Sequence, residues 1–324
     1  MQAHMQADVR VSQNRTMKRR SFLEVGGLGL LANSTALLQA KAPAIAFPKN
    51  ARERLAVASY PFREFIQYPG AKPRQDGKGR MPLTDFPSMV VQRFNVHNTE
   101  PLSEHFVSRE PQYLKELRDA HEKAGARIVN IPFSPAGSFC DPDDAKRQAA
   151  VDDARQWVDA AVMLGSPSVR AHIEGIHGTE PDVERSVASL KALAAYGQQK
   201  QVVVNLENDD PKSEKAEFIT KIIERVASPW LHALPDFCNS MLVGDSEYND
   251  RSLRAMFRHA YNISHVKDSE VDAGKVYRVD VAHIFQIAKS SGYRGFFSME
   301  WEGEADPYTG TQQLIEQSLG SLEG

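Results

Sequence analysis

The sequence lacks the features that mark several protein classes. Cys140 and Cys238 are its only two cysteines and lie far apart, so they form no disulfide framework and no CxxC metal knuckle. The 39 basic and 42 acidic residues give a net charge of −3, which provides no basic footprint for nucleic acid. No G-x-G-x-x-G motif follows the first strand-like run, which disfavours a dinucleotide-binding fold.

The first 46 residues differ from the rest of the chain. Arg19-Arg20 precedes an apolar, glycine-rich stretch from Val25 to Leu38, and Ala44-Ile45-Ala46 fits the small-x-small cleavage pattern. This segment resembles a twin-arginine export signal, and it is too short and too glycine-rich for a membrane span. A charged amphipathic helix is the alternative. We therefore predict a signal peptide with an upstream extension over residues 1–46. The mature protein is predicted to be exported to the periplasm, to begin near Phe47 and to have no stable membrane insertion.

From about residue 52 onward, short apolar runs alternate with helical patterns. The predicted strands are Leu55–Tyr60, Asn95–Glu100, Arg127–Pro132, Ser168–His172, Val202–Glu207, Leu231–Asp236, Asn262–Lys267 and Gly295–Glu300. The predicted helices are Leu83–Phe94, Pro111–Ala124, Asp143–Leu164, residues 181–199, Lys212–Ala227, Ser246–Tyr261, Val279–Ser290 and Thr309–Leu319. Eight such pairs require about 250 residues, so we predict that residues 47–324 form a single (β/α)₈ TIM barrel of the α/β class.

Potential metal ligands stand at the ends of the last four predicted strands. The uninterrupted valines of Val202–Val204 are typical of a strand buried on both faces in a parallel sheet, and this strand ends at Glu207. Asp236, His265 and Glu300 end the next three strands. Each of them alone could be an ordinary turn residue. Parallel strands lie about 4.8 Å apart, and barrel active sites lie at the carboxyl ends of the strands, so we expect the four side chains to meet there.

A divalent metal ion is the simplest partner for this set of side chains. Three carboxylates close together repel one another unless a cation or protons neutralise them. Three oxygen donors and one imidazole favour Mn²⁺, and Mg²⁺, Co²⁺, Fe²⁺ and Zn²⁺ are compatible with them. The sequence therefore predicts a metal-binding barrel mouth.

Four motifs resemble the metal-site motifs of the xylose isomerase-like TIM barrels. They are Asn205-Leu206-Glu207-Asn208, Asp236, His265-Val266-Lys267-Asp268 and Glu300-Trp301-Glu302. That superfamily includes sugar and sugar-phosphate isomerases and epimerases, and inosose dehydratases. The resemblance implies that Glu207, Asp236, His265 and Glu300 bind the metal. It also implies that Glu207 and Glu300 act as catalytic acid and base on opposite faces of the substrate.

Two positions depart from the epimerase members of that superfamily. Asn239 stands where they carry a histidine, and the arginine that they carry a few residues after the metal histidine is missing after His265. Both differences count against keto-sugar 3-epimerisation. Lys267 instead matches the His-x-Lys-Asp pattern of the dehydratase-like members, where it could polarise a substrate oxygen.

Further candidates for substrate binding stand near the strand ends. Structural ion pairs are the alternative for the charged members of this set, and core packing is the alternative for the tryptophan. The predicted substrate-binding residues are Glu100, Arg170, His172, Asn205, Asn239, Lys267 and Trp301.

These observations predict a metal-dependent isomerase or epimerase. It would act through an enediolate on a non-phosphorylated sugar or polyol-derived ketone, because export argues against a phosphorylated substrate. A lyase or dehydratase acting on a keto-sugar, keto-glycoside or inosose is the first alternative, and a non-catalytic, metal-dependent sugar-binding protein is the second. A DNA-repair nuclease is disfavoured because it needs a histidine-rich zinc cluster. The expected partner is a small sugar or polyol, with no nucleic acid, and a homo-oligomer is left open.

Overall fold

The computed structural model describes residues 42–324, apart from residue 75, residues 177–180 and residue 304. Residues 1–41, which hold most of the predicted export signal, lie outside this described part. Within it, none of the helices combines the length and apolar character that crossing a membrane requires.

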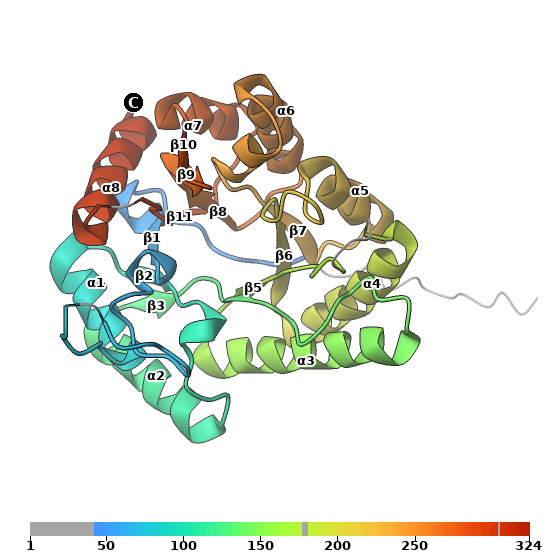
Figure 1. The fold of residues 1–324 in the computed structure, drawn as a ribbon, viewed down its shortest axis with the longest axis horizontal. Coiled ribbons are helices and arrows are strands. Elements are labelled where there is room, and N and C mark those ends of the chain that lie inside the picture. The colour runs from blue at the N-terminus through green and yellow to red at the C-terminus, as the bar shows by residue number, and fades with distance from the viewer. Residues whose placement is uncertain (1–41, 75, 177–180, 304) are drawn as a thin grey trace, which may run out of the picture. The chain divides into compact units, whose positions relative to one another are not determined.

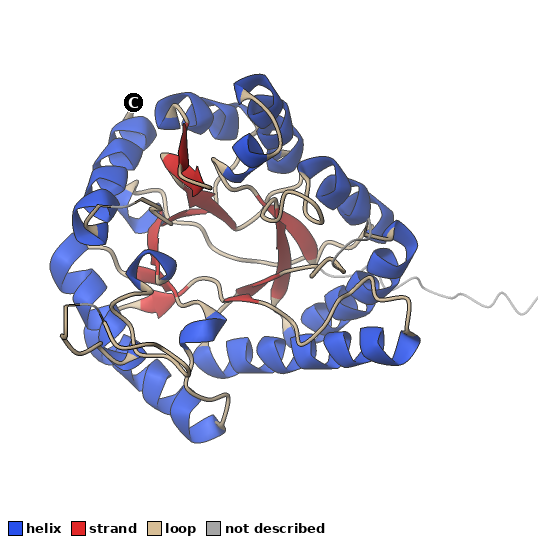
Figure 2. Cartoon of the chain, in the orientation of Figure 1, coloured by secondary structure: helices blue, strands red, loops and turns tan. Residues whose placement is uncertain are grey.

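Parallel strands form the centre of the molecule, and helices surround them (Figures 1 and 2). The strands follow one another around the centre in two sheets, with the orders β3-β2-β1-β11-β8 and β4-β5-β6-β7. Their bounds are β1 Leu55–Ala58, β2 Asn98–Glu100, β3 Arg127–Ile128, β4 Pro132–Phe133, β5 Ser168–Ala171, β6 Val203–Glu207, β7 Leu231–Leu234, β8 Ile263–Val266 and β11 Phe296–Met299.

Two seams join these sheets into a barrel. At the first seam, β3 and β4 are two halves of one predicted strand: Val129 N donates to Thr99 O at 3.0 Å on one side, and Ile131 N donates to Ser168 O at 3.3 Å on the other. At the second seam, a parallel bridge pairs Asp236 with His265 beyond the end of β7. The described residues therefore form an α/β barrel with eight strand positions, as the sequence predicts for this part of the chain.

The helices lie on the outside of the barrel (Figure 2). Local signals set their ends. Asp143 caps α3 by accepting the N–H groups of Ala145 and Lys146, and Gly165 ends that helix at a φ of 73°. The bounds are α1 Phe86–Phe94, α2 Pro111–Ala124, α3 Asp144–Leu164, α4 Val183–Lys200, α5 Ala216–Val226, α6 Ser246–Phe257, α7 Val281–Ser290 and α8 Pro307–Glu323.

Two predictions differ from the structure in ways that affect the barrel mouth. The predicted helix from Lys212 begins only at Ala216, because the Asp210 carboxylate accepts the N–H groups of Lys212 and Ser213 and closes a turn. The segment after β8 forms an unpredicted antiparallel hairpin, β9 Ser269–Asp272 and β10 Lys275–Arg278. Both differences lie in loops that follow strand ends.

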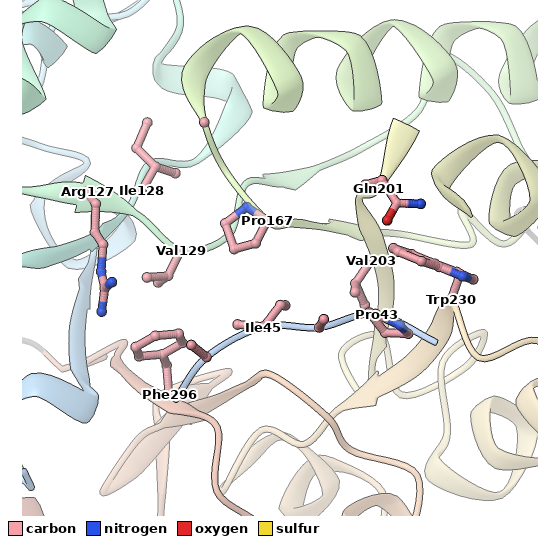
Figure 3. A pocket seen from close by; sticks show the side chains of 13 residues that line it. Pro43, Ile45, Arg127, Ile128, Val129, Pro167, Gln201, Val203, Trp230 and Phe296 are labelled. Carbon is pink, nitrogen blue, oxygen red and sulfur yellow. The ribbon is translucent and has the colours of Figure 1, made fainter. Parts of the chain in front are cut away.

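The segment Pro43–Phe47 crosses the end of the barrel opposite the mouth. Tyr261 Oη donates to Pro43 O at 2.9 Å and accepts from Ile45 N at 3.1 Å. The ring of Phe47 meets those of Tyr261 and Phe296 edge-on, with centroids 5.4 and 5.9 Å apart. Figure 3 shows Pro43 and Ile45 running between Phe296, the first residue of β11, and Val203, the first residue of β6. This segment therefore covers the amino-terminal ends of the strands.

Tyr261→Phe is expected to destabilise the fold by about 1 kcal/mol, because it removes both hydrogen bonds to the segment and keeps the ring. Urea unfolding followed by circular dichroism measures this change. Tyr248→Phe is the matched control, since its hydroxyl donates to Glu217 on the exposed helical surface. An equal loss in both variants would show that Tyr261 does not hold the segment in place.

Candidate functional site

The four predicted metal ligands converge inside the barrel mouth. Glu207 ends β6, Asp236 lies two residues beyond β7, His265 lies in β8 and Glu300 directly follows β11. All four are buried, and one possible ligand atom from each lies within 4.8 Å of the others. The adjacent strands thus bring together donors that are up to 93 residues apart in the sequence.

His265 is held at both ring nitrogens. Nδ1 lies 2.7 Å from Glu207 Oε1 and 3.1 Å from Glu300 Oε2, whereas Nε2 lies 3.0 Å from Glu100 Oε2. Glu100 is fully buried, and its other oxygen accepts a hydrogen bond from Asn130 at 2.7 Å. When Nε2–H donates to Glu100, the lone pair of Nδ1 faces Glu207 and Glu300. A histidine that binds a metal ion together with these carboxylates needs this orientation.

Asp236 presents one carboxylate oxygen without a hydrogen-bond partner. Oδ1 accepts the N–H groups of Cys238 at 2.8 Å and Asn239 at 2.7 Å. Oδ2 is buried with no hydrogen-bond partner among the described residues, and Lys267 Nζ lies 3.9 Å from it. Burial raises the pKa of the Asp236 carboxyl to about 8. An oriented but unsatisfied oxygen beside two further carboxylates and an imidazole fits a divalent cation.

Positive groups already compensate part of the carboxylate charge. Burial alone would lower the pKa of His265, but Glu100, Glu207 and Glu300 together raise it well above its ordinary value. Burial alone would raise the pKa of Glu300, but His265 and Lys267 together lower it below its ordinary value. His265 and Lys267 therefore favour the ionised form of Glu300.

Lys267 is buried in a second group of carboxyl and amide oxygens at the same mouth. Its Nζ lies 3.0 Å from Asn239 Oδ1, 3.0 Å from Glu270 Oε2 on the β9–β10 hairpin and 3.2 Å from Glu302 Oε2. The same atom is 3.4 Å from Glu300 Oε2. The unpredicted hairpin therefore supplies a carboxylate that fixes this lysine beside the cluster.

A pocket of about 870 Å³ opens beside the cluster. Its lining contains five of the predicted functional residues: Arg170, His172, Asn239, Lys267 and Glu300. The pocket thus brings Glu300, a member of the cluster, into contact with the space that a ligand would occupy.

The sequence profile of the xylose isomerase-like TIM barrel family matches residues 94–323. The chain belongs to this family. No curated protein matches the chain. The predicted membership of the xylose isomerase-like barrels is therefore confirmed.

Solved structures share the xylose isomerase-like fold at low sequence identity. An L-ribulose 3-epimerase is similar over 83% of this chain and 95% of its own, with a TM-score of 0.64 and 16% identity. A D-allulose 3-epimerase from Methylomonas sp., in complex with D-allulose, is similar over 86% and 99%, with a TM-score of 0.62 and 16% identity. A xylose isomerase-like TIM barrel protein from Mycobacterium smegmatis, in complex with magnesium, is similar over 84% and 99%, with a TM-score of 0.62 and 15% identity.

Three predicted substrate-binding residues of this xylose isomerase-like barrel do not line the described part of the pocket. Glu100 lies behind His265, as described above. Asn205 is fully buried, with Nδ2 3.4 Å from Val169 O. Trp301 is only 8% exposed, and its indole packs so closely on Gly310 that a Cβ there would come within 2.2 Å of it. These side chains support the site rather than form its surface.

The sequence reasoning missed several acidic residues of the pocket. Glu302 lies within a motif that resembles the family, and its other oxygen accepts the Tyr60 hydroxyl at 2.7 Å. Glu270 lies on the unpredicted hairpin, and Asp209 and Glu214 lie in the turn that replaces the first residues of the predicted helix. The Asp209-Asp210 pair directly after a strand is the signal that could have revealed this turn.

Glu100→Gln is expected to weaken divalent-metal binding about tenfold. The change keeps the shape of the side chain but removes the negative charge that accepts the Nε2–H of His265. Titration calorimetry with Mn²⁺ measures the affinity. Glu104→Gln, at the rim of the same pocket, is the control. Unchanged affinity in Glu100→Gln would show that Glu100 does not influence the cluster.

Proposed function

We propose that this protein is a divalent-metal-dependent isomerase or epimerase, with Mn²⁺ as the favoured ion. Its substrate would be a non-phosphorylated sugar or polyol-derived ketone. The observation that carries the proposal is the position of Glu300. This residue belongs to the group of four possible metal ligands, called here the metal-fitting cluster, and it also lines the pocket. The fold shared with ketose 3-epimerases supports this reading.

The chemistry needs an acid and a base beside a stabilised negative charge. Glu300 would remove the proton next to the substrate carbonyl, and Glu207 would return a proton on the other face. Arg170 Nε lies 2.8 Å from Glu207 Oε2 and holds that carboxylate in place. A divalent ion held by Glu207, Asp236, His265 and Glu300 would supply the Lewis acid that stabilises an enediolate.

The charge of the pocket supports a substrate without a phosphate group. Acidic side chains outnumber basic ones along the lining: Glu104, Glu174, Asp209, Asp210, Glu214, Glu270, Glu300 and Glu302 face Arg170, Lys212 and Lys267. Two of these basic groups are already engaged by carboxylates, Arg170 by Glu207 and Lys267 by Glu270. A phosphate would therefore meet net repulsion, whereas sugar hydroxyls can donate to the carboxylates.

Asn239 favours a lyase or dehydratase as the second candidate. Asn239 lines the pocket, at the position where the epimerase members of the superfamily carry a histidine. Its Nδ2 is buried without a hydrogen-bond partner among the described residues. The side-chain amide of Asn239 donates hydrogen bonds but does not act as a general acid or base at neutral pH. If an oxygen substituent beside the enediolate departs instead, the same proton removal leads to elimination.

The experiment is incubation of Mn²⁺-loaded protein in D₂O with D-allulose, L-ribulose, an inosose and a 3-keto-glycoside. Deuterium incorporation with interconversion of isomers, followed by ¹H NMR, supports the isomerase. Loss of water or aglycone supports the lyase. Saturable binding with neither deuterium incorporation nor loss of water or aglycone would refute an enzyme and favour a binding protein.

We also propose that the protein is exported by the twin-arginine route to the periplasm, on the strength of Arg19-Arg20 and the apolar stretch that follows. Replacing both arginines by lysine is expected to leave the full-length protein in the cytoplasm, because that route reads the arginine pair as an address. Cell fractionation with immunoblotting measures the distribution. Periplasmic accumulation of the double variant would refute this route.

A further inference from the structure

A histidine–carboxylate pair lies in the pocket outside the metal-fitting cluster. His172 directly follows β5, and its backbone N donates to Phe133 O at 3.2 Å, which fixes it to the barrel wall. Its ring Nδ1 lies 2.9 Å from Glu214 Oε2, and the ring lines the pocket. The pair therefore joins the end of one strand to the loop that follows the next strand.

Glu214 is built to orient this ring. Its side chain is only 2% exposed. One oxygen accepts the N–H of Ile173 at 2.5 Å, and the oxygen that faces His172 also accepts the N–H of Asp210 at 3.2 Å. An ionised carboxylate can only accept hydrogen bonds, so the Nδ1 atom of His172 that faces Glu214 carries a proton. The other ring nitrogen, Nε2, faces the pocket.

The second ring nitrogen of His172, Nε2, faces a carboxylate that solvent can reach. Nε2 lies 3.3 Å from Asp209 Oδ2, whose side chain is 37% exposed. Burial and Arg170 by themselves lower the pKa of His172, but Glu214 and Asp209 raise it above its ordinary value. His172 therefore keeps its second proton to higher pH than an ordinary imidazole does, on the nitrogen that faces Asp209.

A proton suits this position better than a second metal ion. Ligand atoms of His172, Asp209 and Glu214 lie within 4.8 Å of one another, so a cation is the competing explanation. However, the described residues bring only three possible ligands together here, against four in the group that contains Glu207. Both oxygens of Glu214 are also occupied by N–H donors, as described above.

Arg170 connects the pair to the reacting end of the pocket. Its Nε lies 2.8 Å from Glu207 and its Nη2 lies 3.8 Å from Asp209, so one guanidinium separates His172 from the cluster. Glu300 and His172 line the same pocket, so a sugar bound with its carbonyl end at Glu300 would have other oxygens within the space that His172 lines.

We propose that His172 gives the proton on Nε2 to a substrate oxygen and that Glu214 is its positioning residue, a role that rests on the proposed function. The N–H bond breaks as the new O–H bond forms, and the imidazolium becomes a neutral imidazole that keeps its Nδ1 proton on Glu214. In the elimination reaction the receiving oxygen is the leaving group, which departs with the electron pair of its C–O bond. After elimination, solvent restores the proton on Nε2, which faces the exposed Asp209. In isomerisation, the neutral imidazole takes the proton back when the substrate carbonyl re-forms.

The charged groups around His172 come from two strand-end segments. Arg170 lies in β5 and Glu174 follows that strand, and after β6 they are Asp209, Asp210, Lys212 and Glu214. Because the raised pKa keeps the acid form present to higher pH, kcat is expected to fall as pH rises through the His172 pKa. In Glu214→Gln that fall shifts to lower pH, and in His172→Gln it disappears.

The test compares Mn²⁺-loaded wild type, His172→Gln, Glu214→Gln and a control on whichever of the four ketones in the D₂O experiment is turned over. His172→Gln is expected to lower kcat about 100-fold with little change in KM and in Mn²⁺ affinity. His259→Gln is the control, because His259 forms a similar pair with Glu224 at 3.3 Å, away from the pocket lining.

NMR titration of the His172 imidazole in Mg²⁺-loaded protein provides a readout that does not need turnover. Its pKa is expected above about 6.5 and is expected to fall in Glu214→Gln. A wild-type kcat and pH profile in His172→Gln would overturn the inference and leave the proposed function intact. If the wild type turns over no ketone, the proposed function fails and the proton-donor role fails with it. A His172 pKa below 6.5 overturns the role whatever the activity.

Discussion

Glu300→Gln is expected to lower turnover at least ~1,000-fold, since general acid–base groups contribute about 10²–10⁴-fold and this residue also fits a metal ligand. The carboxylate lies at the pocket surface, 3.1 Å from His265 Nδ1 and 3.4 Å from Lys267 Nζ. Both cations favour its ionised, proton-accepting form, and an uncharged amide cannot take the proton. Rates of deuterium incorporation into the ketone measure the change.

Glu207→Gln is expected to have a loss of similar size, and Glu116→Gln, on the exposed face of α2, is the control for both. Metal content is measured in each variant, so that loss of the base is separated from loss of the ion. Wild-type rates in a Glu300→Gln protein that still holds its metal would refute the assignment of Glu300 as the base.

Asp236→Asn is expected to weaken Mn²⁺ binding by more than about 100-fold, beyond the range for residues that only support a ligand. Backbone N–H groups of Cys238 and Asn239 hold Oδ1. An asparagine would keep its oxygen there and turn its NH₂ group toward the cluster. That group donates hydrogen bonds and has no lone pair for a metal ion.

Calorimetry and elemental analysis measure the loss, and chelation of the wild type followed by Mn²⁺ addition should remove and restore activity. Asp272→Asn, on the exposed end of β9, is the control because it changes the same group away from the pocket. Full metal content in Asp236→Asn would exclude this carboxylate as a ligand.

The strand positions of the barrel could be predicted because each one leaves a strong local signal. Val203–Glu207 is buried throughout, and a run of valines without alternation is how such a strand looks in sequence. The convergence of Glu207, Asp236, His265 and Glu300 followed from strand order alone. No local pattern was needed beyond a donor at each strand end.

The direction of individual side chains could not be predicted in the same way. Glu100 and Glu300 both stand at strand ends, but Glu100 lies beneath His265 and Glu300 reaches the pocket. Which layer a side chain occupies depends on the tilt and stagger of neighbouring strands, which a single sequence does not specify. Trp301 faces the helix layer for the same reason.

The β9–β10 hairpin was missed although its turn is encoded locally. Ala273 and Gly274 both have positive φ, 49° and 78°, as a two-residue hairpin turn requires. Alanine is an unusual residue at such a position, so the familiar Asn-Gly or Asp-Gly signal is absent. A hairpin between β8 and α7 also breaks the expected alternation of strand and helix.

The segment Pro43–Phe47, which covers the end of the barrel opposite the mouth, affects where a signal peptide could be cleaved. The bond after Ala46 lies between Ile45, tethered to the Tyr261 hydroxyl, and Phe47, wedged between two rings. Proteases cut most readily where the chain is exposed and unanchored. A passenger that folds before transport would shield this bond, and the triplet Ala40-Lys41-Ala42 offers the same spacing further upstream. If the protein is exported as proposed, intact mass analysis of the exported form is therefore expected to give a first residue at or before Pro43.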